Sequence, residues 1–218
     1  MANIVKRSFK FTWRKIVAGI YYLLINLPFF KFIKETRHTQ TPCTFRMWFY
    51  QKVMGFNRKA YWPVHFTSKI NGYKNVYAGI ETCPGYEAGC YIQGIGKIHI
   101  GDYTQIAQNV GIVSANHDVY ENQHHISGKE VRIGKYCWIG MNAVILPGVV
   151  LGDFTVVGAG SVVTKPFPDG YCVIGGNPAK IIKKLEPDKC VRYKSSIEYN
   201  GYIPAKKFEA YREKNLWI

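Results

Sequence analysis

The sequence predicts an all-β fold, a parallel β-helix, and three observations lead to that prediction. An aliphatic residue recurs every six positions, a glycine often follows it directly, and a shorter run with the same spacing comes earlier. This period is neither the 3.6-residue period of an α-helix nor the two-residue alternation of an ordinary strand. It is typical of a β-helix, in which each six-residue unit contributes one short strand.

The longer run lies in the second half of the chain. Its aliphatic positions are Ile133, Ile139, Ile145, Leu151, Val157 and Val163. Its glycines are Gly134, Gly140, Gly152 and Gly158. We expect the aliphatic side chains to point into a prism and the small residues to let the chain turn at its corners. Three units close one coil, so positions three units apart, such as Ile133 and Leu151, should stack.

The shorter run has the same spacing and is followed by an interruption. Its positions are Ile100, Ile106 and Ile112, with Ile92 and Ile98 leading into it. The step from Ile112 to Ile133 is longer than a whole coil and is not a whole number of units. We therefore expect the polar stretch Asn116–Lys129 to leave the prism as a loop over about residues 114–130. Loops that project from rigid scaffolds often carry function.

Three stretches of the chain then resemble a known family. They read IAQNVGIVSANHD, VRIGKYCWIGMNAVILPGVVLGDFTVVGAGSVVTK and GGNPAKIIKKL. They resemble the hexapeptide-repeat galactoside, maltose and streptogramin acetyltransferases, and most closely the O-acetyltransferases of capsule and lipopolysaccharide synthesis. The resemblance covers about residues 92–185 and leaves out residues 1–70 and 190–218. It implies a left-handed parallel β-helix, a homotrimer with active sites between neighbouring subunits, and direct acetyl transfer.

We expect three parts in the chain. Residues 1–69 form a basic, apolar, helical N-terminal extension. Residues 70–178 form the left-handed β-helix catalytic domain with its protruding loop. Residues 179–218 form a C-terminal extension that is mainly helical.

His117 matches the family's catalytic histidine. An alcohol is a poor nucleophile until a base removes its proton, and neutral imidazole titrates near the working pH. The resemblance therefore implies that His117 is the general base. Its other ring nitrogen needs a partner that fixes the tautomer. Asp118, Glu121 and a backbone carbonyl all remain candidates for that partner.

The resemblance also implies a binding site for acetyl-CoA and no metal ion. Trp138 matches the aromatic residue that lies along the pantetheine arm, where a flat apolar surface is buried. Lys180 and Lys183 match cations near the CoA phosphates, although galactoside-type enzymes tend to have Arg there. The other matches line the cofactor groove: Met141, Ala159, Thr164 and Lys165.

For the acceptor, the resemblance implies a hydroxyl of a sugar or glycan, which a lipid can carry. N-acetylation of an amino sugar is an alternative. Enzymes of that type usually carry an N-terminal nucleotide-binding unit, and residues 1–75 lack its glycine fingerprint. A non-catalytic β-helix assembly protein is a second alternative, against which the presence of His117 speaks.

Two other classes fit poorly. A γ-type carbonic anhydrase shares the β-helix but needs three histidines on one zinc ion, and the pair at His124 and His125 does not have the spacing of the resembling anhydrases. Nucleic-acid binding would suit the net charge of +15, but the basic residues accompany a long apolar run and no nucleic-acid-binding motif.

The positive charge is concentrated near the N-terminus. Residues 1–75 hold 14 Lys or Arg and one acid, whereas residues 76–179 hold five and eight. The uncharged run Ile16–Phe30 would make about 22 Å of helix, short of the ~30 Å hydrocarbon core, and Pro28 would end that helix. We expect residues 1–60 to hold the protein on the anionic inner face of the cytoplasmic membrane without crossing it. The alternative is a helical cap on the β-helix.

The cysteines give an expectation about the compartment. The six cysteines form no CxxC pair, and no cleavable signal peptide is apparent. Reduced thiols and a cytoplasmic location are therefore expected.

Overall fold

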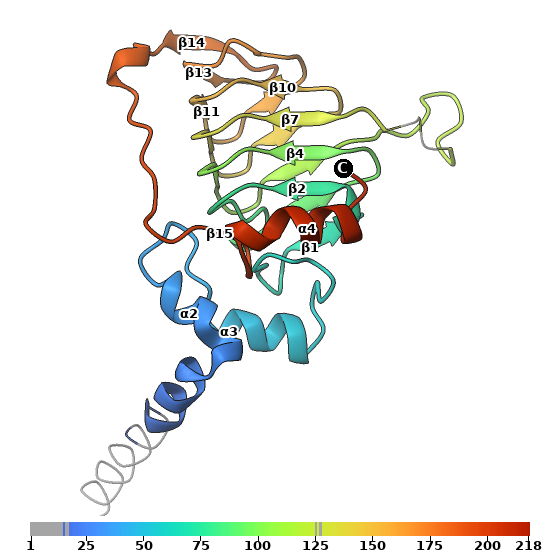
Figure 1. Ribbon diagram of the computed structural model, residues 1–218. Coiled ribbons are helices and arrows are strands. Elements are labelled where there is room, and N and C mark those ends of the chain that lie inside the picture. The colour runs from blue at the N-terminus through green and yellow to red at the C-terminus, as the bar shows by residue number, and fades with distance from the viewer. Residues whose placement is uncertain (1–14, 16–17, 125, 127) are drawn as a thin grey trace, which may run out of the picture.

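The computed structural model describes the chain except for residues 1–14, 16–17, 125 and 127. Short strands wind around a three-sided prism, and Figure 1 shows them stacked as successive coils. The predicted parallel β-helix is confirmed.

Each side of the prism is one sheet, and we name the three sheets faces A, B and C. Face A contains β1 (Lys69–Asn71), β3 (Tyr91–Gln93), β6 (Gly111–Val113), β9 (Val144–Ile145) and β12 (Val162–Val163). Face B contains β2 (Val76–Ala78), β4 (Ile98–Ile100), β7 (Val131–Ile133) and β10 (Val150–Leu151). Face C contains β5 (Gln105–Ile106), β8 (Trp138–Ile139), β11 (Thr155–Val157), β13 (Cys172–Gly175) and β14 (Lys180–Lys184). Neighbouring strands are parallel except β13 and β14, which are antiparallel.

The six-residue repeat forms the core of the prism. Ile133 pairs with Leu151, and Ile139 pairs with Val157, so side chains one coil apart stack as predicted. All six positions of the longer run are at most 2% exposed. Burying one such side chain contributes about 1.5–3 kcal/mol relative to leaving it exposed. The repeat therefore supplies much of the stability of the coils.

The glycines of the repeat are required by close packing between coils. A Cβ atom on Gly134 would lie 2.6 Å from the carbonyl carbon of Gly152, and one on Gly152 would lie 2.2 Å from the oxygen of Pro168. The expected reason, freedom to turn the corner, is wrong for these positions, because their φ angles lie outside the left-handed region. Other residues make the left-handed corner turns, among them Asn142 and Tyr136.

The loop has the predicted bounds, because β6 ends at Val113 and β7 begins at Val131. Ile112 lies on face A and Ile133 on face B, so a regular step between them would be one unit rather than a coil. Ile112 stacks on Ile145 in the next coil. A coil of three regular units would have brought a residue much earlier in the sequence to that position. The excursion therefore nearly doubles the length of its coil, and Figure 1 shows it projecting from the side of the prism.

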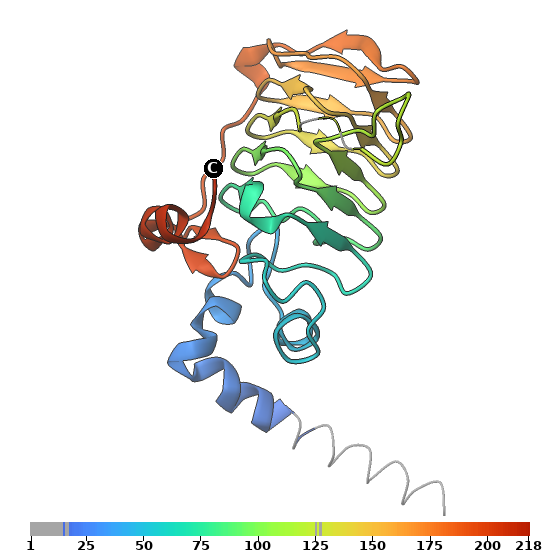
Figure 2. The same cartoon turned by 90° about the vertical axis from the view of Figure 1, so that its right-hand side faces the viewer.

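The N-terminal extension is helical in part and caps the first coil. Residues 18–26 are helical and are followed by η1 (Pro28–Phe30), α2 (Lys31–Glu35), α3 (Phe45–Trp48) and the π-helical turn η2 (Phe49–Val53). Trp62 is fully buried in the same cluster as the β-helix core, and its indole donates to the oxygen of Pro84 at 2.8 Å. In Figure 2, residues 18–26 extend away from the coils.

The C-terminal extension is not mainly helical, which corrects the sequence prediction. After β14 come η4 (Pro187–Lys189), the hairpin of β15 (Tyr199–Asn200) and β16 (Ile203–Pro204), and α4 (Ala205–Asn215). Face C continues through β14 beyond the expected domain end at residue 178, because β14 folds back on β13. Phe208 of α4 packs into the main core cluster.

Two further observations concern the whole described chain. No described helix combines the length and apolar character that a membrane span requires. All six cysteines are free thiols, and five of them are buried.

Candidate active site

Backbone hydrogen bonds connect the two arms of the loop that carries His117. Backbone amides of Lys129 and Ile126 donate to the oxygens of Ser114 and Asn116 at 2.7 and 2.9 Å. At the tip, the side chain of Asp118 accepts from the amides of Tyr120 and Glu121 at 2.8 and 3.1 Å. Such bonds within the loop fix its backbone, so His117 projects from a shaped support.

Ser114 anchors the root of this hairpin in the prism. Its side chain is fully buried and donates to the oxygen of Gln93 at 2.6 Å, while it accepts from the amide of Gly96 at 2.9 Å. Both partners belong to the coil below. The loop is thus tied to the rigid part of the fold where it leaves the prism.

The imidazole of His117 is exposed, and one of its nitrogens has a defined partner. Nδ1 lies 2.5 Å from the backbone oxygen of Asn122 in the same loop. A carbonyl oxygen can only accept, so Nδ1 carries a proton, and in the neutral ring Nε2 then carries the lone pair. Of the three candidate partners left open by the sequence, the backbone carbonyl is the one observed. This tautomer suits a general base that acts through Nε2.

A second histidine of the loop is paired differently. Nδ1 of His124 lies 2.9 Å from the carboxylate of Glu121, and both side chains are largely exposed. His125 lies outside the described residues. Among the residues that the structure does describe, no three His, Cys, Asp or Glu side chains are grouped to hold a metal ion.

The predicted acetyl-CoA residues are all exposed. Five of them lie on face C and at two corners of the prism, and the other two lie on β14 at its end. Trp138, on β8, is 56% exposed on face C. Met141 and Ala159 lie at the corner between faces C and A, one coil apart, and the amide of Gly160 donates to the oxygen of Met141 at 2.8 Å. Thr164 and Lys165 follow β12, at the corner between faces A and B.

The two predicted phosphate contacts lie at the end of the prism. Lys180 and Lys183 both belong to β14, whose five residues are all exposed. Within the described chain neither ammonium group lies at salt-bridge distance from an acid. They are therefore available to an anionic group.

One chain does not bring these residues together. The loop leaves the prism between β6 and β7, at the corner between faces A and B. Met141 and Ala159 lie at the opposite edge of face A, and only Thr164 and Lys165 share the corner of His117, two coils further along. The candidate base and most of the candidate cofactor residues thus lie on different edges of the prism.

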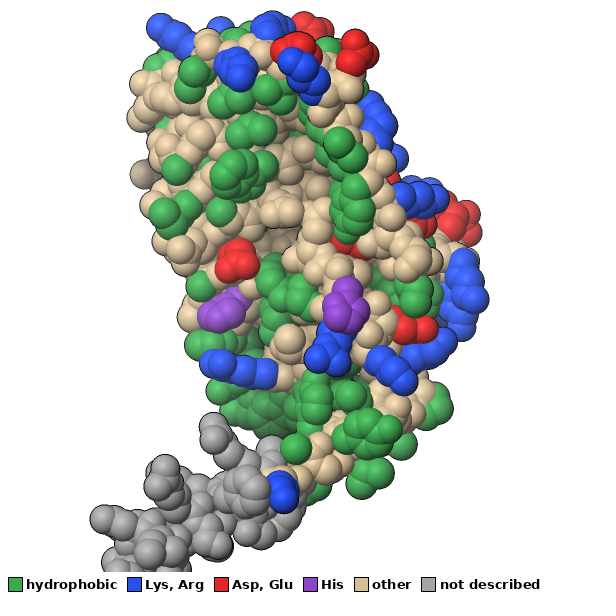
Figure 3. All heavy atoms as spheres, turned by 90° about the vertical axis from the view of Figure 1, so that its left-hand side faces the viewer, with side chains coloured by type: hydrophobic (Ala, Val, Ile, Leu, Met, Phe, Trp, Pro, Cys, Tyr) green, Lys and Arg blue, Asp and Glu red, His purple; other side chains and the backbone are tan. Residues whose placement is uncertain are grey.

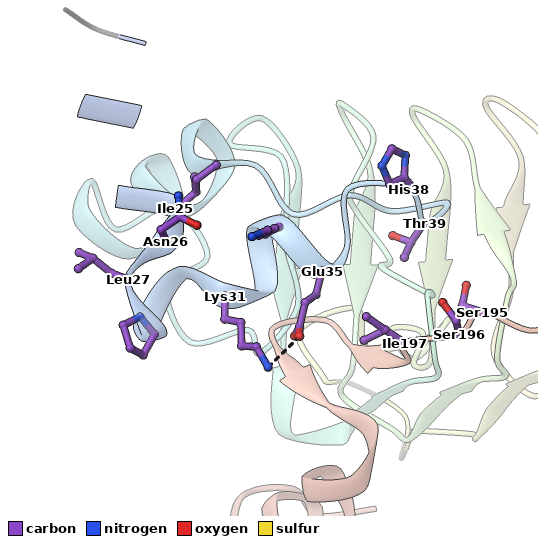
Figure 4. A pocket seen from close by; sticks show the side chains of 12 residues that line it. Ile25, Asn26, Leu27, Lys31, Glu35, His38, Thr39, Ser195, Ser196 and Ile197 are labelled. Atoms are coloured by element: carbon purple, nitrogen blue, oxygen red, sulfur yellow. Dashed lines mark ion pairs between the residues drawn. The ribbon is translucent and has the colours of Figure 1, made fainter. Parts of the chain in front are cut away.

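One large cavity lies away from all of these side chains. It has a volume of about 670 Å³ and lies between the N-terminal extension and the C-terminal segment. Figure 4 shows the ion pair of Lys31 and Glu35 at its wall, with Ile25 and Leu27 on one side and Ile197 on the other. A smaller cavity, of about 460 Å³, includes Trp138. Only the smaller of these two cavities is lined by a predicted acetyl-CoA residue.

Residues outside the repeat complete the surroundings of Trp138, and no pattern in the sequence indicated them. Gln40 comes from the N-terminal extension, and Val191 and Tyr193 come from the C-terminal segment. They have no motif and no periodic spacing. Only the tertiary structure places them beside β8.

Comparison with known proteins is consistent with this architecture. Residues 130–165 match the family model described as bacterial transferase hexapeptide (six repeats). A putative acetyltransferase of Schizosaccharomyces pombe is 35% identical over 115 residues, 51% of this chain and 54% of that protein. A putative acetyltransferase of Staphylococcus aureus is 36% identical over 118 residues, 53% of this chain and 55% of that protein. The chain thus spans about half the length of these curated relatives.

Two solved structures are similar to this chain, and the first of them shares its fold. A maltose O-acetyltransferase from Clostridium difficile 630 aligns with a TM-score of 0.51 and 29% identity, over 74% of this chain and 91% of that protein. A galactoside acetyltransferase in complex with coenzyme A aligns over 59% of this chain and 68% of that protein, with 29% identity and a TM-score of 0.49. The repeat is the left-handed β-helix unit of such proteins. Residues 130–165 therefore carry the bacterial transferase hexapeptide repeat, and the relatives that share it are acetyltransferases.

Proposed function

We propose that this protein is an acetyl-CoA-dependent O-acetyltransferase that acetylates a hydroxyl group of a sugar, in the synthesis of a surface polysaccharide. The observation that carries the proposal is His117, whose Nδ1–H donates to the oxygen of Asn122 on an anchored hairpin. Acetyltransferase relatives and the maltose O-acetyltransferase fold support the reaction class. N-acetylation of an amino sugar uses the same base and is the second candidate.

In the proposed reaction, acetyl-CoA and the sugar are both substrates. Nε2 of His117 accepts the proton of the attacking hydroxyl as its oxygen bonds to the thioester carbonyl carbon. The carbon–sulfur bond then breaks, and the histidine returns the proton to the departing CoA thiolate. The products are the acetyl ester and CoA, and the enzyme ends in its starting protonation state.

The test of this reaction is acetyl transfer from acetyl-CoA to a panel of sugars, followed by mass spectrometry. Matched acceptors that carry a hydroxyl or an amine at the same ring position separate the two candidates. Ester products with the hydroxyl acceptors support O-acetylation. Amide products alone would select N-acetylation, and no transfer to either acceptor would remove the acetyltransferase assignment.

The same proposal includes a homotrimer with shared sites. His117 lies at one edge of face A, whereas Met141 and Ala159 lie at the other, so a neighbouring copy is needed to bring the two sets together. Light scattering should give three times the 24.9 kDa mass of the chain. A mixture of His117→Ala and Trp138→Ala subunits should regain activity at low acetyl-CoA, because some shared sites then hold both native residues. A monomer at micromolar concentration contradicts the shared site.

We also propose that the N-terminal extension binds the anionic inner surface of the cytoplasmic membrane. Large apolar side chains are exposed on and after the helical residues 18–26 and around η2: Ile20, Tyr21, Tyr22, Leu23, Leu27, Phe29, Phe49, Val53, Met54 and Phe56. Cations accompany them: Lys31, Lys34, Arg37, Arg46, Arg58 and Lys59. Figure 3 shows hydrophobic and basic side chains together at this end of the molecule. Apolar area beside cations is the pattern of an interfacial membrane contact.

The two alternatives for this extension describe different parts of it. Phe30, Phe32 and Ile33 are buried in a cluster with Tyr199 of β15, so the later part packs on the C-terminal hairpin. Leu23 and Leu27 remain 69% and 49% exposed. We therefore assign the membrane contact to residues 18–29 together with the exposed side chains around η2.

Vesicle flotation tests this contact. The native protein should float with anionic vesicles at low salt and much less with neutral vesicles or at high salt. The double variant Leu23→Glu/Leu27→Glu should stay at the bottom. Ile182→Glu, which changes a side chain that is 69% exposed at the opposite end of the prism, is the control and should float. Native protein that stays at the bottom with anionic vesicles contradicts the proposal.

A further inference from the structure

A groove runs between face C and the C-terminal segment that follows η4. Its volume is about 460 Å³. The segment descends along the left-hand side of Figure 1, which is the side that faces the viewer in Figure 3. The lining residues are Gln40, Tyr103, Gln105, Tyr136, Cys137, Trp138, Phe154, Val191 and Tyr193. Three separate parts of the chain therefore build this groove.

Stacked aromatic rings form one side of the groove. Tyr103, Tyr136 and Phe154 occupy the same corner in successive coils, each with a left-handed backbone, at φ 58°, 56° and 56°. The ring centroids are 5.3 Å apart between Tyr103 and Tyr136, and 4.9 Å apart between Tyr136 and Phe154. A non-glycine residue is uncommon in this conformation, and the stacking of the rings stabilises it here.

The C-terminal segment is held against these rings by specific contacts. The hydroxyl of Tyr136 donates to the backbone oxygen of Tyr193 at 3.0 Å, and the ring of Tyr193 packs edge-on against Tyr103 with centroids 5.0 Å apart. The guanidinium of Arg192 lies 5.1 Å from the ring centroid of Phe154. The second wall of the groove is thus fixed in place.

The buried carboxylate of Glu81 bonds to two residues that line the groove. Glu81 is 2% exposed, and its Oε2 accepts from the hydroxyl of Tyr193 at 2.6 Å and from the amide of Gln40 at 3.1 Å. Its Oε1 is buried without a hydrogen-bond partner among the described residues. A buried carboxylate costs stability unless it is bonded, so its main effect here is to position Tyr193 and Gln40.

The open side of the groove carries the groups that can bind a ligand. The ring of Trp138, the expected contact of the pantetheine arm, is 56% exposed, and the side chain of Gln105 is exposed beside it. The amide of Gln105 donates one hydrogen bond to the side-chain oxygen of Gln40. An amide has two donors and one oxygen that accepts twice, so both kinds of group remain available to a ligand.

The chemistry of the lining selects the class of ligand. No residue of the lining is an acid or a lysine, arginine or histidine. Flat apolar rings bury apolar surface, while amide and phenol groups bond to hydroxyls. A neutral pyranose ring has both features, a face of C–H groups and an edge of hydroxyls.

We propose that this groove binds a neutral sugar unit of the acceptor, with Gln105 and Tyr193 as residues that determine acceptor specificity. The inference rests on the proposed acetyl transfer to a sugar. It adds where the sugar binds and that the sugar is neutral. It also assigns a role to segments that lie outside residues 130–165, the part of the chain that the family model matches. Glu81 is a positioning residue in this proposal.

Ligand-observed NMR and calorimetry on the full chain test the proposal without relying on turnover. The probes are methyl glycosides of glucose, galactose and N-acetylglucosamine, with glucuronate as the charged comparison. At least one neutral glycoside should bind, and glucuronate should bind more weakly. Gln105→Ala should weaken that binding about fivefold to tenfold, the effect of about one hydrogen bond. The Kd for CoA should stay unchanged.

Two further variants separate recognition from folding. Tyr193→Ala should weaken sugar binding, whereas Tyr91→Ala on face A should not, although the two tyrosines are 38% and 37% exposed. Glu81→Gln should weaken sugar binding less than Tyr193→Ala, because the Gln amide can still bond to Tyr193.

The outcomes distinguish the groove from the reaction. Absence of binding by all three neutral glycosides, or equal binding by Gln105→Ala and the native protein, overturns the assignment of the groove. A raised Kd for CoA in Gln105→Ala with unchanged sugar binding assigns the groove to the donor instead. Sugar binding in the groove without any acetyl transfer would contradict the proposed function alone.

Discussion

Nδ1 of His117 donates to the backbone oxygen of Asn122, five residues later, at 2.5 Å. Asp118 and Glu121 lie between the two residues, but the carboxylate of Asp118 bonds to backbone amides of the loop and that of Glu121 bonds to His124. The carbonyl oxygen fixes the tautomer in which Nδ1 carries a proton. The loop therefore fixes the orientation of the His117 ring through Nδ1.

The first prediction concerns His117. His117→Ala should lower kcat by about 10²–10⁴, the usual contribution of a general base, while folding and CoA binding stay intact. Steady-state kinetics with the true acceptor and calorimetry with CoA make the comparison. His124→Ala is the matched control in the same loop and should keep kcat within about threefold of the native value. Near-native turnover of His117→Ala shows that another group is the base.

The second prediction concerns Trp138. Trp138→Ala should raise KM for acetyl-CoA about tenfold, which corresponds to about 1.4 kcal/mol of lost contact, and should leave kcat nearly unchanged. The side chain is 56% exposed, so its loss should not lower Tm. Trp217→Ala, which removes a 65% exposed ring from the C-terminus, should change neither constant. An unchanged KM in Trp138→Ala leaves no role for this ring in donor binding.

The third prediction concerns the cations of β14. Lys180→Ala/Lys183→Ala should raise KM for acetyl-CoA about threefold to tenfold at low salt, because each lysine can bond to a phosphate as a point charge. The difference should shrink at high salt through screening. Lys189→Ala, whose ammonium group pairs with Glu186 at 2.8 Å, is the control. The double variant should also be compared with acetyl-CoA and with acetyl-dephospho-CoA, which lacks the 3′-phosphate. An equal rise in KM for both donors would exclude contact with the 3′-phosphate.

The fourth prediction concerns pH and the junction of the two extensions. Tyr199 donates a hydrogen bond to Glu35, and Lys31 forms an ion pair with it at 2.9 Å. The bond from Tyr199 and then that from Lys31 lower the pKa of Glu35 below its ordinary 4.5. A carboxylate with a lowered folded-state pKa contributes stability above its unfolded-state pKa and loses it as the pH falls through the folded-state value.

Glu35→Gln should therefore lower Tm by about 1–3 °C at pH 7, in line with a partly exposed ion pair of up to about 1 kcal/mol. The difference from the native protein should disappear as the pH falls below 4.5, towards the lowered pKa. Calorimetric scans from neutral pH into the acid range measure this. Glu213→Gln, an exposed position on α4, is the control. A difference that persists in acid would indicate altered packing in place of lost charge.

The sequence alone determined the β-helix, because a six-residue aliphatic period fits no other regular backbone. Ile133 and Leu151 could be paired from their spacing, since equal units that close a coil in threes must stack one coil apart. The faces that the loop joins could not be predicted, because the spacing between Ile112 and Ile133 does not reveal which face each residue occupies. Their burial and the loop bounds 114–130 were predicted correctly, whereas the faces on which they lie were not predicted.

Only the tertiary structure decided what surrounds the candidate chemistry. The carbonyl of Asn122 carries no sequence signal, because every residue has one, and the fold of the hairpin alone brings it to His117. The bond between Glu81 and Tyr193 joins positions 112 residues apart. No local period or motif encodes such a contact, because it depends on how the C-terminal segment packs against coils formed by another part of the chain.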